Sequence, residues 1–216
     1  MEITFYAVAV SAFAAKARIA LDWKDLTYAE LAPPDGYGSP AYRAIVPAGS
    51  VPGLVVDGRA LHDSNAIVEL LDEIAPEPPL FPSDPFARAE TRALLGFHDT
   101  RLEAAARALF PLVKRDWRAE PDAVIAGVGG IDAALERLAD LVSPRPFHLG
   151  AAPTIADLCY PVTLQMAEML AAEMERPLSV APKLDDWRAA AAAEPAVARS
   201  LRIAHAAMEA WLAGFR

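Results

Sequence analysis

The chain has 216 residues, with 29 acidic against 20 basic side chains and a formal net charge of -9. It therefore has no basic stripe to neutralise phosphates, which argues against a nucleic acid or an anionic membrane as partner. The single cysteine, Cys159, excludes an intrachain disulfide and a cysteine-rich zinc site.

Several patterns bear on the compartment and on cofactors. Charges interrupt every apolar run before it reaches membrane-spanning length. Residues 5–15 imitate the apolar core of a secretory leader, but Glu2 stands where a leader carries Lys or Arg. The four histidines lack metal-ligand spacing and no glycine-rich phosphate loop is present. We therefore expect a cytoplasmic protein that uses neither a metal nor a nucleotide.

The first third of the chain mixes strand and helix patterns. They predict a strand over 2–8, a helix over 13–21, a short strand over 28–31, a loop over 33–49 with a helical turn near 42–45, a hairpin of 54–56 with 60–62, and a helix over 64–74. Asp57-Gly58 supplies the hairpin turn. The order resembles the thioredoxin-like fold, and we assign residues 1–76 to this first domain.

A proline-rich connector follows, over residues 77–86, and should be stiff and extended. Beyond it, residues 87–216 are rich in helix formers at helical spacing, which predicts an all-helical second domain. Its expected helices cover 85–115, 121–141, 158–171, 182–193 and 196–213. Thr154 and Asp157 form a helix-start signature before the third of these. The fold class is thus an α/β thioredoxin-like N-terminal domain followed by an all-α C-terminal domain.

Two short motifs predict a binding site for a peptide. Pro52 cannot donate to a strand ladder, and a cis Val51-Pro52 bond would turn the Val51 backbone outward to pair with a ligand. Asp63 and Ser64 open a helix whose free N–H groups attract an anion, with the N-cap role as the alternative for Ser64. A ligand that fits both motifs carries an ammonium group for the Asp63 carboxylate and, beside it, a carboxylate for Ser64 and the helix start. Its peptide backbone pairs with Val51.

This arrangement resembles the glutathione site of the cytosolic glutathione transferase superfamily. The resemblance implies that glutathione, as co-substrate, contacts Ser50, Val51, Pro52, Asp63 and Ser64. The Thr154 and Asp157 signature is a second resemblance, since a similar capping box opens a core helix in that superfamily. The resemblance to the superfamily also implies a homodimer.

Ser11 is the candidate catalytic residue. It stands between the first strand and first helix, where its hydroxyl and the helix dipole would favour a thiolate and lower the thiol pKa. Its offset to Arg18-Ile19-Ala20-Leu21 is similar to that of the catalytic serine in zeta-like and theta-like transferases. The alternatives are an ordinary N-cap for Ser11 and Tyr6 as the catalytic hydroxyl.

The second substrate should meet an apolar pocket. We expect Phe13 on one wall and Phe110, Leu112 and Trp117 on the other, with core packing as the alternative for each of these three. The zeta-class run Ser-Ser-Cys-Ser-Trp-Arg is replaced here by Ser11-Ala12-Phe13-Ala14-Ala15-Lys16, so the isomerase chemistry of that class is not expected.

The predicted function is a glutathione transferase of the serine type. Ser11 would stabilise the glutathione thiolate, which attacks an electrophilic carbon of a small, largely apolar second substrate. Two alternatives stay open: a binding or regulatory protein that keeps the fold without turnover, and a glutathione-dependent isomerase, lyase or peroxidase that uses the same thiolate.

Overall fold

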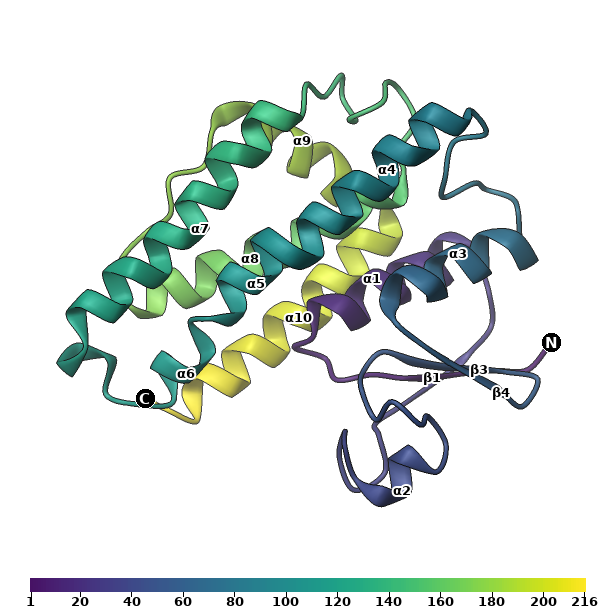
Figure 1. Cartoon of the computed structure of the whole chain (residues 1–216), viewed down its shortest axis with the longest axis horizontal. Helices are drawn as coiled ribbons and strands as arrows, with labels where there is room; N and C mark the ends of the chain where they lie inside the picture. Colours follow the sequence, from purple (N-terminus) through teal and green to yellow (C-terminus); the bar gives the residue numbers. More distant parts are fainter.

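The computed structural model describes residues 1–216 and contains a small sheet flanked by a larger group of helices (Figure 1). The strands are β1 (Ile3–Tyr6), β2 (Ala29–Leu31), β3 (Gly53–Val56) and β4 (Arg59–His62), in the order β2-β1-β3-β4. β1 pairs parallel with β2 and antiparallel with β3, and β3 pairs antiparallel with β4. This mixed sheet confirms the predicted thioredoxin-like arrangement.

Three helices belong to the sheet region: α1 (Ala12–Trp23), α2 (Pro40–Arg43) and α3 (Ser64–Ile74). The remaining helices are α4 (Pro85–Phe97), η1 (His98–Leu102), α5 (Glu103–Arg107), α6 (Phe110–Val113), η2 (Trp117–Ala119), α7 (Pro121–Leu141), α8 (Ile155–Glu173), α9 (Pro182–Ala192) and α10 (Pro195–Ala213). They confirm the predicted all-α C-terminal domain. No helix combines the length and the apolarity needed to cross a membrane.

The single helix predicted over 85–115 is wrong. The backbone passes through a π-helical turn at His98–Leu102, and α5 ends at Arg107. The single turn α6 then follows, with Pro111 in its first turn, where the missing N–H has no intrahelical partner to lose. The chain therefore changes direction before Phe110 instead of continuing along α5.

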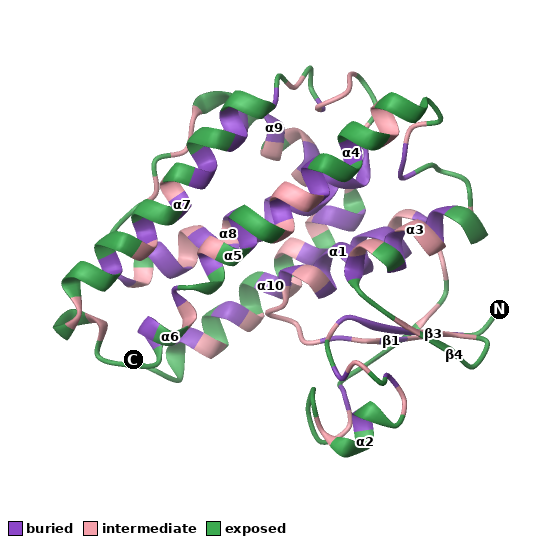
Figure 2. Cartoon of the chain, viewed as in Figure 1, coloured by how far each residue is buried: buried purple, intermediate pink, exposed green.

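Helix α1 lies at the centre of the molecule and is buried on all sides (Figure 2). It packs against α3 within the sheet region and against α8 and α10 of the helical region. Its buried alanines, among them Ala14, Ala17 and Ala20, let these neighbours approach closely. One continuous hydrophobic core therefore spans both regions and fixes the position of the N-terminus of α1.

Asp157 holds the start of α8 through a buried carboxylate. Its oxygens accept hydrogen bonds from the Thr154 N–H at 2.7 Å, the Thr154 hydroxyl at 2.8 Å, the His148 N–H at 2.7 Å and the Trp187 Nε1–H at 2.8 Å. The predicted return contact from Asp157 to the helix start is therefore present. The carboxylate also ties α8 to α9 and to the preceding loop.

Replacing Asp157 with Asn should lower the free energy of unfolding by about 2 to 4 kcal/mol. The amide NH₂ would face donors, which leaves buried groups without acceptors. Urea unfolding followed by circular dichroism measures this loss. Asp140→Asn, at an exposed position on α7, is the matched control and should change stability by less than about 0.5 kcal/mol. Equal stability of the two variants would contradict the assigned role.

Candidate functional site

Ser11 is the N-cap of α1. Its Oγ accepts a hydrogen bond from the Ala14 N–H at 3.2 Å, and its own N–H donates to the Val8 carbonyl at 2.9 Å. The hydroxyl donates to no protein group and so keeps its proton available for a ligand. The capping role and the predicted catalytic role are therefore compatible, because one uses the oxygen lone pair and the other the O–H.

The predicted glutathione contacts meet at one small cavity of about 270 Å³. Its lining contains all five of them together with two further residues: Ser50, Val51, Pro52, Asp63 and Ser64, with Phe13 and Asp99. The Val51-Pro52 peptide bond is cis. The loop before it is held by the Tyr42 hydroxyl, which donates to the Ser50 carbonyl at 2.9 Å.

Asp63, and not Ser64, is the N-cap of α3. Its Oδ1 accepts from the N–H groups of Asn65 at 2.9 Å and Ala66 at 3.1 Å, while its backbone adopts a left-handed φ of 74°. Ser64 is the first helical residue and is buried. The second carboxylate oxygen of Asp63 makes no protein hydrogen bond, so a negatively charged acceptor remains available at the cavity.

Asp99, which sequence reasoning missed, brings a second carboxylate to this cavity from the helical region. Its Oδ1 accepts from Lys16 Nζ at 2.6 Å, and its Oδ2 accepts from Asn65 Nδ2 at 2.8 Å. Lys16 is fully buried and also donates to Asn65 Oδ1 at 2.8 Å. These three residues tie together α1, α3 and η1. No local motif could have revealed a contact between residues 83 positions apart.

His98 completes the network on its buried side. Its Nδ1 lies 2.6 Å from Asp99 Oδ1 and its Nε2 lies 2.7 Å from the Thr163 hydroxyl. Complete burial lowers the pKa of His98, and the hydrogen bond to Asp99 only partly opposes this. We therefore assign a neutral ring that donates from Nδ1 to Asp99 and accepts from Thr163.

Asp99 is held as a carboxylate. Burial raises the pKa of Asp99, but the hydrogen bond from His98 and the positive charge of Lys16 together outweigh it, and the pKa is lowered. The charge of Asp99 is paired with that of Lys16, so the unpaired negative charge at this cavity is that of Asp63 at the start of α3.

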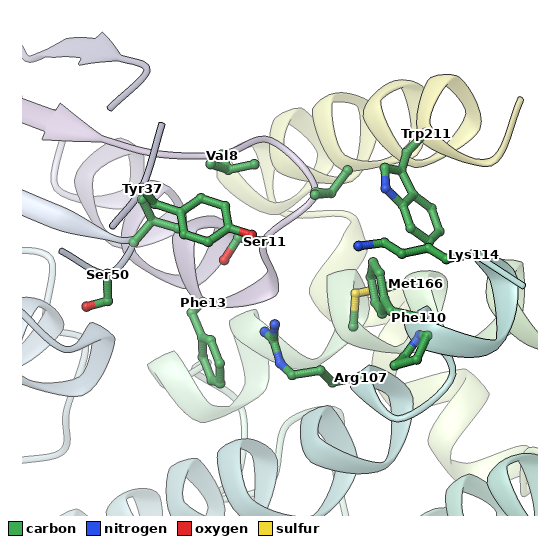
Figure 3. A pocket seen from close by; sticks show the side chains of 13 residues that line it. Val8, Ser11, Phe13, Tyr37, Ser50, Arg107, Phe110, Lys114, Met166 and Trp211 are labelled. Carbon is green, nitrogen blue, oxygen red and sulfur yellow. The ribbon is translucent and has the colours of Figure 1, made fainter. Parts of the chain in front are cut away.

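A larger cavity of about 660 Å³ adjoins the first and contains Ser11 (Figure 3). Phe13, Ser50 and Val51 line both cavities, so the two are neighbours. The remaining lining residues come mostly from the helical region and the loop before α2: Val8, Val10, Tyr37, Arg107, Phe110, Pro111, Lys114, Met166 and Trp211. The ring centroids of Phe110 and Trp211 lie 4.8 Å apart. The Ser11 hydroxyl thus lines a mainly apolar cavity, next to the smaller one.

Two of the residues expected at the apolar wall lie elsewhere. Leu112 is buried in the core and faces α7 near Gly127, and Trp117 lines a separate depression beside Arg118. Phe110 and Leu112 are two positions apart on α6 and therefore point to opposite sides of it, whereas Trp117 lies beyond α6, in η2. The apolar wall instead includes Met166 and Trp211, which no local sequence signal distinguishes from core residues.

Cys159 is a structural thiol. It is buried in α8, and burial raises the pKa of its thiol to about 12. A thiol with that pKa is not a nucleophile near neutral pH. No group of three or more His, Cys, Asp or Glu side chains is arranged to hold a metal ion.

Comparison with known proteins identifies the family. The glutathione S-transferase N-terminal domain profile matches residues 5–79. A maleylacetoacetate isomerase of Pseudomonas aeruginosa is 32% identical over 71% of this chain and 76% of its own length. A probable glutathione S-transferase of Zea mays is 33% identical over 89% of this chain and 87% of its own. The chain belongs to the glutathione transferase superfamily.

Solved structures of this superfamily share the whole fold. A glutathione S-transferase of Rhodospirillum rubrum, 26% identical, aligns with a TM-score of 0.74 over 92% of this chain and 91% of its own. The theta-class enzyme of Xanthomonas axonopodis, also 26% identical and solved with glutathione bound, aligns with a TM-score of 0.73 over 92% and 96%. A tau-class transferase of mango, at 20% identity and a TM-score of 0.79 over 97% of both chains, shows the fold alone.

The buried His98 should make this transferase fold less stable as the pH falls from about 7.5 to 5.5. Its pKa is below the ordinary 6.5 in the folded chain, so the unfolded chain takes up the proton first. The stability that the neutral His98 ring confers is present above pH 6.5 and is lost as the pH falls toward the pKa of His98 in the folded chain. Urea unfolding at several pH values measures the slope.

The comparison is between His98→Gln and His205→Gln. The first variant should show a flatter decline than the wild type, whereas the second, at an exposed position on α10, should keep the wild-type decline. An unchanged slope in His98→Gln would show that the ring does not resist protonation.

Proposed function

We propose that the protein is a glutathione transferase that binds glutathione in the 270 Å³ cavity and an electrophile in the 660 Å³ cavity. The observation that supports this most directly is the position of Ser11. Its free O–H lines the larger cavity at the N-terminus of a helix, and Phe13, Ser50 and Val51 line both that cavity and the smaller one. A thiolate at that point would accept a hydrogen bond and also experience the positive end of the helix dipole.

The smaller cavity suits the two ends of glutathione. The Val51 backbone pairs with the peptide main chain, and the carboxylate of the glutamyl group meets the hydroxyl and N–H of Ser64 at the start of α3. The ammonium of the same group pairs with the free carboxylate oxygen of Asp63, and Asp99, which is already paired with Lys16, lines the same cavity. Ser50 and Pro52 complete the wall beside the peptide.

The reaction then needs no base supplied by the protein. The thiol proton leaves to solvent water when glutathione binds, and the Ser11 O–H donates to the resulting thiolate. For an electrophile that carries a halide, a carbon–sulfur bond forms and the carbon–halogen bond breaks, with the halide leaving with its electron pair. The hydrogen bond and the helix dipole each contribute about 1 kcal/mol to thiolate stability.

A glutathione-dependent isomerase is the second candidate. It is supported by the Pseudomonas relative and by a maleylpyruvate isomerase of a Ralstonia species, 32% identical over 66% of this chain and 71% of its own length. The residues from Ala12 to Lys16 weigh against it, because they differ from the zeta-class run. Assays with maleylacetoacetate separate the two reactions, since isomerisation regenerates glutathione whereas transfer consumes one thiol per product.

We further propose a homodimer, which the family resemblance implies. A shallow groove between α7 and the η1–α5 segment could receive a second copy; its lining combines apolar residues such as Phe97, Ala105 and Leu141 with the arginines Arg101 and Arg137. Light scattering should give twice the 23.1 kDa mass of one chain, and a single-chain mass at micromolar concentration would refute the dimer.

Replacing Ser11 with Ala should raise the thiol pKa of bound glutathione by about one unit, because one hydrogen bond to the thiolate is lost. Ultraviolet difference spectra of the thiolate, recorded as a function of pH, measure this shift. The kcat/KM for an aryl halide should fall by about tenfold at neutral pH. The helix cap is lost as well, at about 1 kcal/mol of stability.

Ser11→Thr is the matched control because it keeps both the hydroxyl and the cap, and it should recover most of the activity. If Ser11→Ala left the thiol pKa unchanged, the catalytic assignment would be abandoned. Calorimetry of the wild type with reduced glutathione tests the binding step separately, and no saturable heat at millimolar glutathione would refute the whole proposal.

A further inference from the structure

The larger cavity is lined by two cationic side chains and by no acidic one. The cations are Arg107 and Lys114, and the other polar contributions are the hydroxyls of Ser11, Tyr37 and Ser50. This composition contrasts with a chain that carries a net charge of -9. A positive wall facing a mainly apolar space selects for a ligand with a negative group on an apolar body.

Arg107 is already compensated by its own helix. Its Nε donates to Glu103 Oε2 at 3.2 Å, its second nitrogen pairs with the other oxygen, and the Glu103 side chain is buried. The guanidinium also lies 5.5 Å from the centroid of the Phe13 ring. Arg107 therefore helps to shape the wall but adds little net charge to the cavity.

Lys114 is not compensated in this way. It follows α6 as its C-cap and is exposed, and its ammonium forms neither an ion pair nor a side-chain hydrogen bond. Figure 3 shows this ammonium turned into the cavity, near Met166 and across from Arg107.

Lys114 also borders a neighbouring depression that holds two acids, Asp116 and Glu173. Glu173 pairs with Arg216 at 2.6 Å, and Asp116 accepts one backbone hydrogen bond from Arg118. Neither acid forms an ion pair with Lys114, so its charge remains available to a ligand in the larger cavity.

We propose that Lys114 is a specificity-determining residue, which binds an anionic group, such as a carboxylate, of the second substrate. This inference rests on the proposed transferase function. The apolar body of the substrate packs on the tilted rings of Phe110 and Trp211, and its reacting carbon faces Ser11. The preferred electrophiles are then aromatic or apolar acids whose charge lies away from the reacting carbon.

Two aryl chlorides that differ only in charge test this. In 4-chloro-3-nitrobenzoate and 4-chloro-3-nitrobenzamide, glutathione displaces chloride from the same ring position. The kcat/KM of each, divided by its uncatalysed rate with glutathione, gives a normalised preference. The wild type should prefer the benzoate by about fivefold, which is the size expected for a partly exposed ion pair. Raising the salt concentration to 0.5 M should reduce this preference.

The variant Lys114→Met should bring the normalised preference close to one, because it keeps the aliphatic stem and removes the charge. Lys183→Met is the matched control, since Lys183 is an exposed lysine on α9 without an ion pair, and it should keep the wild-type preference. An equal loss of the preference for the benzoate in both variants would show a general effect of net charge and overturn the role of Lys114. A wild-type preference for the benzamide would overturn it as well.

Binding of the two reaction products gives a readout that does not require turnover. The S-aryl glutathione conjugates with a ring carboxylate and with a ring carboxamide should differ by about fivefold in Kd, and Lys114→Met should remove the difference. Equal Kd values in the wild type would overturn the inference but leave the proposed function intact. Failure of both conjugates and of glutathione to bind would refute the proposed function together with the inference.

Discussion

The central constraint in this molecule is the burial of α1, including the charge of Lys16 at its middle. A fully buried ammonium is tolerated only when it is paired and hydrogen-bonded, and Asp99 and Asn65 supply those partners. Because Asp99 belongs to the helical region and Asn65 to α3, the pairing locks the two regions at one relative position. The N-terminus of α1, and with it Ser11, is held by that same packing.

The two cavities follow from this arrangement. The sheet region supplies a backbone edge at Val51 and the start of α3, while the helical region supplies Asp99 to the small cavity and about half of the wall of the large one. Neither region contains the whole site. The fold thus positions the Ser11 hydroxyl in the wall of the larger cavity, which shares Phe13, Ser50 and Val51 with the smaller one, and the function proposed above depends on this arrangement.

Local sequence was informative wherever a contact lies within a few residues. The hairpin at Asp57-Gly58, the helix over 64–74 and the return contact from Asp157 to Thr154 depend on turn chemistry and capping, which operate over two to four positions. The break in the helix over 85–115 was missed because α4 and α5, on either side of the π-helical turn, are rich in good helix formers such as Ala, Leu, Glu and Arg. Leu112 packs in the core, which was the stated alternative, and Trp117 lines a separate depression.

The amino-acid sequence by itself determined the fold class, the grouping of five glutathione-site candidates around Val51 and Asp63, and the placement of Ser11 at a helix start. Periodicity, turn residues and helix caps carry that information along the chain. Only the tertiary structure decided that Asp99 joins the small cavity and that Lys114 faces the large one. Those placements depend on how distant helices pack, and packing is set by the fit of many side chains at once.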